Sequence, residues 1–260
     1  MCSLQMTSCA NIRLIARLDI KGPNLIKGIQ LEGLHVLGDP SKFANKYYTQ
    51  GVDELIYSDV VASLYGRNSL HDVVRETARQ IFVPLTVGGG VRSREDVNSL
   101  LAVGADKVSV NTAAVKDPDL ITRIANTFGS QCCVVEIQAK KTSDHNWTVL
   151  VDNGREPTGM NVLDWTSQAI ERGAGEILLT SIDRDGTRSG VDLELIAAVS
   201  EVATVPVIAS GGVGKPDDAV QALVNTNLHS IAIADMFHYQ RATICDVKSQ
   251  LSDAGLEIRP

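Results

Sequence analysis

Two short apolar segments that each end in glycines constrain the fold of this chain more than any other feature. They read V-P-L-T-V-G-G-G over residues 83–90 and V-P-V-I-A-S-G-G over residues 205–212, and an amphipathic stretch follows each one. This pattern is typical of a buried parallel strand that opens onto a turn, where glycine leaves backbone N–H groups uncovered. A helix N-terminus after such a turn favours an anion, so each segment predicts either a phosphate site or a tight turn.

These segments belong to a longer internal repeat. The sequence G-V-D-E-L-I-Y-S at residues 51–58 matches G-A-G-E-I-L-L-T at residues 173–180, and an offset of 122 residues relates both pairs of segments. That unit is too long for a solenoid repeat, which spans roughly 20–50 residues. Two similar halves of alternating strand-like and helix-like segments predict duplicated half-barrels that close into one (β/α)₈ TIM barrel. We therefore expect a single domain over residues 1–260, with half-barrels at about residues 11–131 and 132–255.

Charge and cysteine usage argue against several classes of protein. The net charge is −7 and the basic residues are scattered, whereas nucleic-acid binding needs a basic face. No apolar run approaches the roughly 18 residues of a membrane span, and the N-terminus lacks a secretory signal pattern. The odd number of cysteines and their spacing suit neither a disulfide framework nor a metal site. We expect a reduced, cytoplasmic protein without a metal or cofactor; its cysteines are Cys2, Cys9, Cys132, Cys133 and Cys245.

Polar residues stand at the C-terminal ends of the predicted strands, where barrel enzymes carry their chemistry. Asp19 ends the strand predicted at residues 14–19, and Asn111-Thr112 follows the strand predicted at residues 107–110. Asn and Thr in that place suit a phosphate or a helix cap. Residues 21–31, which include Lys27, predict a hairpin or lid over the barrel mouth. Further strands are predicted at residues 54–59, 132–138, 176–181 and 230–234, and a second hairpin at residues 146–151.

Four charged residues stand at the opposite, N-terminal ends of predicted strands. In a barrel they would form a ring of alternating sign at its bottom. Such a ring either stabilises that end of the barrel or gates a passage along the barrel axis, and the sequence leaves both readings open. The four residues are Arg13, Glu54, Lys107 and Glu176.

From about residue 11 to residue 239 the chain resembles the cyclase subunit of imidazole glycerol phosphate synthase. The motifs that carry the resemblance are V-G-G-G, A-D-K-V-S-V-N-T-A-A-V, F-G-S-Q, G-A-G-E-I-L-L-T-S-I-D-R-D-G-T and I-A-S-G-G. The resemblance implies an enzyme that takes ammonia from a glutaminase subunit docked at the bottom of the barrel. The ammonia would pass through the barrel and react with a phosphoribulosyl aminoimidazole nucleotide. The implied products are imidazole glycerol phosphate and aminoimidazole carboxamide ribonucleotide, in histidine biosynthesis.

The resemblance also assigns roles to individual residues. The ring of four charged residues matches an ammonia gate, Asp106 matches a residue at the glutaminase interface, and Asp19 matches one of two catalytic aspartates. Gly90, Asn111 and Thr112 match one phosphate site. The positions that match the lining of the mouth are Lys27, Asp59, Thr180, Asp185 and Ser210, and those of the other phosphate site are Gly186, Gly211, Gly212, Ala234 and Asp235.

Two positions depart from the family pattern. The second catalytic aspartate lies in a motif of the type A-I-D-A-K, which reads E-I-Q-A-K here, so Gln138 stands in its place. A carboxylate exchanges a proton near neutral pH when its pKa is tuned, whereas an amide only orients a substrate by hydrogen bonds. The family has an Ala-Ser pair after the last strand, which here is Ala234-Asp235. A carboxylate there would repel a phosphate dianion and favour a neutral or hydroxyl-bearing group.

Three functions are therefore weighed. The first is the authentic cyclase of histidine biosynthesis, favoured by the extent of the match. The second is a diverged paralogue that uses channelled ammonia to amidinate an N-acetylated or nucleotide-linked sugar in surface-polysaccharide biosynthesis, favoured by Gln138 and Asp235. The third is a non-catalytic activator of the glutaminase, which the retained Asp19, Lys27 and Asp59 argue against.

Overall fold

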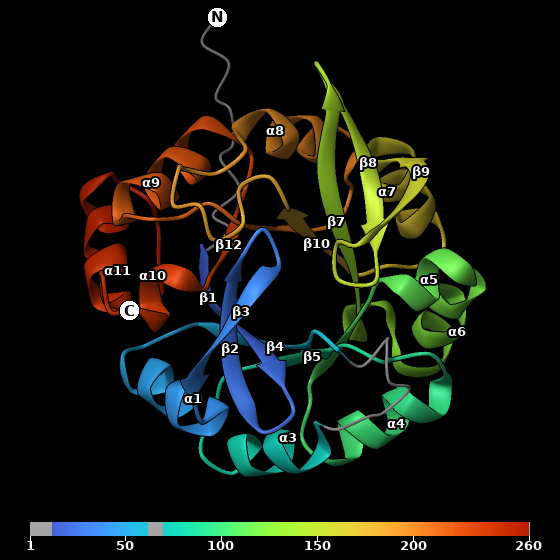
Figure 1. Ribbon diagram of the computed structural model, residues 1–260, viewed down its shortest axis with the longest axis horizontal. Helices are drawn as coiled ribbons and strands as arrows, with labels where there is room; N and C mark the ends of the chain where they lie inside the picture. The colour runs from blue at the N-terminus through green and yellow to red at the C-terminus, as the bar shows by residue number, and fades with distance from the viewer. Residues whose placement is uncertain (1–11, 62–69, 260) are drawn as a thin grey trace, which may run out of the picture.

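Eight parallel strands form a closed barrel in the structure, a computed structural model that describes residues 12–61 and 70–259. Each strand pairs with the next, and the last pairs with the first through the register Arg13 to Ser230 and Ala16 to Ile233 (Figure 1). The single (β/α)₈ barrel predicted from the sequence is confirmed. In order round the barrel the strands are β1 (Arg13–Lys21), β4 (Glu54–Asp59), β5 (Leu85–Gly88), β6 (Lys107–Val110), β7 (Cys133–Ser143), β10 (Glu176–Ser181), β11 (Val207–Ser210) and β12 (Ser230–Ile233).

Helices surround the barrel on its outside (Figure 1). The first begins at Pro40, because Asp39 accepts a hydrogen bond from the Ser41 N–H and proline suits the first turn of a helix. The described helices are α1 (Pro40–Thr49), α3 (His71–Ala78), α4 (Arg94–Ala102), α5 (Thr112–Lys116), α6 (Asp119–Phe128), α7 (Val162–Glu171), α8 (Leu193–Val202), α9 (Pro216–Asn225), α10 (Asp235–His238) and α11 (Ile244–Asp253), with a 3₁₀ turn at Ser130–Cys132.

Two antiparallel hairpins are added to the barrel at equivalent places. Strands β2 (Asn24–Ile29) and β3 (Glu32–Gly38) extend β1, and strands β8 (Asn146–Val151) and β9 (Glu156–Asn161) extend β7. Figure 1 places the blue β2–β3 hairpin over the barrel opening and the yellow-green β7–β8–β9 sheet at its rim. The first and fifth barrel strands thus carry the same insertion, which supports a duplicated origin. The boundaries of the two halves stay a prediction.

A separate apolar layer fills the middle of the barrel, inside the ring of strands. Its members are fully or almost fully buried and do not join the larger core between strands and helices. Side chains alternate between the two faces of a strand, so the residues two positions away from this layer also point into the barrel. The layer consists of Ile15, Ile56, Val134, Leu178, Ile208 and Ala232.

No helix of the described chain is long and apolar enough to cross a membrane. Cys132, Cys133 and Cys245 are free thiols, and Cys2 and Cys9 lie outside the described residues. Within residues 12–61 and 70–259 no cluster of three or more His, Cys, Asp or Glu side chains has the arrangement of a metal site.

Replacing Leu178 with Ala should lower the free energy of unfolding by about 2–5 kcal/mol, because it opens a cavity in the interior layer. Chemical denaturation of the variant and the unmodified protein measures the difference. The control is Val224→Ala, at a position on α9 that is 56% exposed. This change should alter the free energy of unfolding by at most about 0.5 kcal/mol. Equal losses in the two variants would contradict a closely packed interior layer.

Candidate functional site

The four charged residues predicted at the bottom of the barrel form a closed ring beneath the apolar layer. Arg13 Nη1 lies 2.8 Å from Glu54 Oε1 and 2.7 Å from Glu176 Oε1. Lys107 Nζ lies 3.1 Å from Glu54 Oε2 and 2.9 Å from Glu176 Oε2, so each cation bridges both carboxylates. Burial opposes the charge of Arg13, but Glu176 and Glu54 outweigh it, and the pKa of Arg13 is raised. The ring closes the N-terminal end of the barrel, and its role as a gate stays a prediction.

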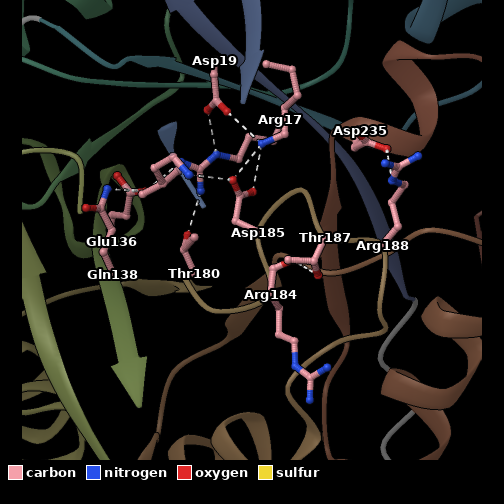
Figure 2. Close-up of polar contacts among 12 residues, drawn as sticks. Arg17, Asp19, Glu136, Gln138, Thr180, Arg184, Asp185, Thr187, Arg188 and Asp235 are labelled. Atoms are coloured by element: carbon pink, nitrogen blue, oxygen red, sulfur yellow. Dashed lines mark hydrogen bonds and ion pairs between the residues drawn. The ribbon is translucent and has the colours of Figure 1, made fainter. Parts of the chain in front are cut away.

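A buried guanidinium occupies the barrel centre on the other side of the apolar layer. Arg17 Nε lies 3.1 Å from Asp19 Oδ1, and Arg17 Nη2 lies 3.0 Å from Glu136 Oε1. Arg17 Nη1 donates to Thr180 Oγ1 at 2.7 Å (Figure 2). Burial would lower the pKa of Arg17, yet Asp19 and Glu136 raise it overall, so the side chain stays charged. Arg17 therefore joins three strands of the barrel through polar contacts.

Asp19 lies between Arg17 and Lys27. Lys27 Nζ, on β2, is 3.5 Å from Asp19 Oδ2 and donates to both oxygens of Asp185 at 2.9 and 3.0 Å. Burial alone would raise the pKa of Asp19, but Arg17 and Lys27 lower it further than burial raises it. Asp19 is consequently a carboxylate at neutral pH, which accepts a proton rather than donates one.

Sequence reasoning missed Arg17 and Glu136. Both occupy positions two residues before a predicted site residue on the same strand, Arg17 before Asp19 and Glu136 before Gln138. The alternation of side chains along a strand places such pairs on one face. This spacing, applied to charged residues in otherwise apolar strands, is the signal that would have found them.

His238 was also missed, and it lies buried behind the site. Its Nδ1 is 2.6 Å from the hydroxyl oxygen of Tyr47 on α1. Burial lowers the pKa of His238 to about 3, although the nearby Asp19 carboxylate opposes that shift. The imidazole is therefore neutral at physiological pH. It serves as packing for α1 and α10 beneath the site.

A cavity of about 300 Å³ opens over the first half of the barrel, between β1, β4, β5, β6 and β7. Its inner wall holds Arg17, Glu136 and Gln138, and its outer wall holds the turn after β5 and the start of α5. The turn needs glycine, because Gly89 and Gly90 have φ values of 93° and 75°. The predicted residues Asp59, Gly90, Asn111 and Thr112 all line this cavity.

Five buried polar atoms around this cavity have no hydrogen-bond partner in the described part of the chain. Buried polar groups are ordinarily paired with protein, water or ligand. Hydroxyl, carbonyl and amide groups are all represented, so the cavity suits a ligand with both donors and acceptors. The atoms are Ser58 Oγ, Ser109 Oγ, Asn111 Oδ1, Gln138 Oε1 and Asn153 Nδ2.

The second glycine turn lines a much smaller space. The cavity there measures about 10 Å³, which leaves room for about one water molecule. Its lining includes Lys27, Asp185, Gly186, Ser210, Gly211, Gly212, Ala234 and Asp235. Asp235 lies 3.9 Å from Arg188 and 3.8 Å from Arg241, away from the Arg17 cluster (Figure 2). The structure thus brings the predicted residues of this site together. A more open depression of about 560 Å³ shares Lys27 and Asp235 with this small space.

Asp106 lies at the N-terminal end of β6, beside a depression of about 390 Å³ on the bottom of the barrel. Its Oδ2 accepts a hydrogen bond from the Leu85 N–H at 2.8 Å and so fixes the start of β5. The same depression contains Phe82, whose side chain is 83% exposed. A large apolar side chain in that position is a candidate contact for another protein.

Comparisons with known proteins agree on one family. A family described as "Histidine biosynthesis protein" matches residues 13–243. The chain is 61% identical over 209 residues to imidazole glycerol phosphate synthase subunit HisF of Legionella pneumophila, covering 80% of this chain and 99% of the relative. It is 44% identical over 247 residues to the subunit of the same name from Streptococcus mutans, and 45% identical to that from Bacillus cereus, each covering 95% of this chain and 98% of the relative.

The stability of the protein should fall in acid partly because of His238. The unfolded histidine binds a proton below its ordinary pKa of about 6.5, whereas the folded one does not until about pH 3. His238 therefore lowers the free energy of unfolding by about 1.4 kcal/mol per pH unit as the pH falls below about 6.5. Between pH 7 and pH 5, the free energy of unfolding measured by denaturation should fall less in His238→Gln than in the unmodified protein. Equal losses would contradict a neutral, buried imidazole.

Proposed function

We propose that this chain, which belongs to the histidine biosynthesis protein family, is the ammonia-using cyclase subunit of an imidazole glycerol phosphate synthase. The observation that carries the proposal is the arrangement of the barrel along its axis. The ring of Arg13, Glu54, Lys107 and Glu176 lies at one end. At the other end is a polar cavity lined by Arg17, with which Asp19 pairs. The family match over residues 13–243 includes both ends.

The proposed partner is a glutaminase that docks on the N-terminal face of the barrel. A depression of about 520 Å³ on that face is lined by Arg13 and Glu176 and so reaches the ring. The exposed Phe82 and the neighbouring Asp106 border a second depression on the same face. Ammonia released there would enter through the ring and travel past the apolar layer, which offers a neutral molecule little to bind.

The proposed substrate is a phosphoribulosyl aminoimidazole nucleotide in the cavity of the first half. One phosphate would bind at the turn of Gly90 and the start of α5, where Asn111 and Thr112 lie. The reacting carbon would then face the barrel axis near Asp19. Addition of ammonia there, and the ring closure that follows with Asp19 as a proton acceptor and Gln138 as a hydrogen-bonding group, lead to imidazole glycerol phosphate and aminoimidazole carboxamide ribonucleotide.

A second function is favoured by two observations at the same face. The space at the second glycine turn is about 10 Å³, and Asp235, where the resemblance leads one to expect Ser, lies there within 4 Å of Arg188 and Arg241. Gln138 replaces a carboxylate that the resemblance leads one to expect. Both changes suit a paralogue that delivers ammonia to an N-acetylated or nucleotide-linked sugar.

Turnover of the phosphoribulosyl substrate with ammonium at high pH separates the two functions, because free ammonia bypasses the glutaminase. We expect substrate loss with the unmodified protein. Asp19→Asn should lower kcat by about 10²–10⁴-fold, since an amide does not accept the proton. A protein that binds no phosphoribulosyl substrate and turns none over would exclude the cyclase reaction and direct the search to sugar acceptors.

Substituting Phe82 with Asp should weaken binding to a histidine-pathway glutaminase by about tenfold or more, since buried aromatic side chains dominate many interfaces. Isothermal titration calorimetry of the two purified subunits measures the dissociation constant. Val36→Asp on β3, at the opposite end of the barrel and 65% exposed, is the matched control and should leave binding unchanged. Equal affinities in all three proteins would contradict docking at the face that carries Phe82.

A further inference from the structure

Strand β7 carries a second polar side chain on the face that bears Gln138. Val134 belongs to the interior apolar layer, so Glu136 and Gln138 follow it into the barrel at intervals of two residues. Glu136 is 7% exposed and lines the cavity of the first half. It therefore lies between the apolar layer and Gln138, where a molecule that rises along the barrel axis first reaches the cavity.

The hydrogen bonds that the described residues donate to Glu136 all reach the same one of its two oxygens. Arg17 Nη2 donates to Glu136 Oε1 at 3.0 Å, and Gln138 Nε2 donates to the same oxygen at 3.4 Å. No described residue donates to Glu136 Oε2. A carboxylate only accepts hydrogen bonds, so it fixes the Gln138 amide with its nitrogen towards Glu136. The amide oxygen, Oε1, is then left without a partner in the described residues.

We propose that Glu136 is the catalytic proton acceptor for ammonia addition, in place of the carboxylate that Gln138 has replaced. The inference rests on the proposed function, because it concerns the ammonia reaction in the same cavity. Glu136 differs from Asp19 in that Asp19 contacts both Arg17 and Lys27, whereas Glu136 contacts one cation through one oxygen. Glu136 Oε2 can accept a proton while Oε1 keeps its hydrogen bond from Arg17.

The chemical step follows from this placement. The lone pair of ammonia forms a bond to the carbonyl carbon of the substrate, and the π electrons of the carbon–oxygen bond move to the oxygen. The new nitrogen then carries one proton too many, and this proton passes to Glu136. Glu136 returns it to the alkoxide oxygen, which gives a neutral carbinolamine and restores the carboxylate.

Arg17 is a positioning residue in this scheme. A carboxylate buried at this depth without a partner would be costly to ionise, and the guanidinium removes that cost. Arg17 is itself fixed by Thr180 and Asp19, so it holds Glu136 in one orientation beneath the cavity. Gln138 contributes by donating to the same oxygen of Glu136.

The test is ammonium-dependent turnover of the phosphoribulosyl substrate by E136Q, at a fixed concentration of free ammonia. We expect kcat to fall by about 10²–10⁴-fold with KM changed by less than about threefold. The double variant E136Q/Q138D should recover most of the lost kcat, because it returns a carboxylate to the same face of β7. Thermal unfolding checks that each variant is folded, and E201Q, at an exposed position of α8, is the control for the same chemical change.

Each outcome decides the inference. An active unmodified protein together with an equally active E136Q would overturn the role of Glu136 and leave the proposed function intact. An inactive E136Q that neither Q138D nor the alternative variant E136D restores would assign Glu136 a structural role and overturn the inference. An unmodified protein without turnover would overturn the proposed function, and the inference with it.

Discussion

The charged guanidinium of Arg17, at the centre of the barrel, determines which side chains can surround it. Arg17 is almost fully buried, and a charge in such a place persists only when opposite charges and hydrogen-bond acceptors surround it. Asp19, Glu136 and Thr180 supply them from three different strands. The polar residues that line the cavity are therefore held in place by one another, above an apolar layer that keeps them away from the ring at the bottom.

The two predicted halves of the barrel have a similar backbone arrangement, but the spaces beside their glycine turns differ in volume and lining. The glycines in both turns have positive φ values. In each half, the next barrel strand is followed by a short helix, which is α5 after β6 and α10 after β12. One turn borders a cavity of about 300 Å³ and the other a space of about 10 Å³. Sequence duplication alone would predict two equal sites, whereas Lys27, Asp185 and Asp235 line the smaller one.

Local patterns in the sequence predicted most of the fold. Strand β4 and strand β6 were predicted at their observed bounds, because charged residues mark where they begin and polar residues follow where they end. The ring at the bottom was predictable because its four members stand at the starts of the first, second, fourth and sixth barrel strands. The pairing of Arg17 with Glu136 was not, because it joins residues 119 positions apart whose contact depends on barrel closure. The burial of His238 likewise depends on the packing of α10 against α1.

The charges at the barrel centre also determine which way round a phosphorylated ligand can lie. Three carboxylates and two cations meet there: Asp19, Glu136 and Asp185 against Arg17 and Lys27. The balance is negative, so a phosphate dianion is repelled from the axis. At the outer wall of the cavity, the turn at Gly89 and Gly90 and the ammonium of Lys116, at the end of α5, attract the phosphate. A ligand with one charged and one uncharged end would thus present its uncharged end to the axis before any specific contact forms.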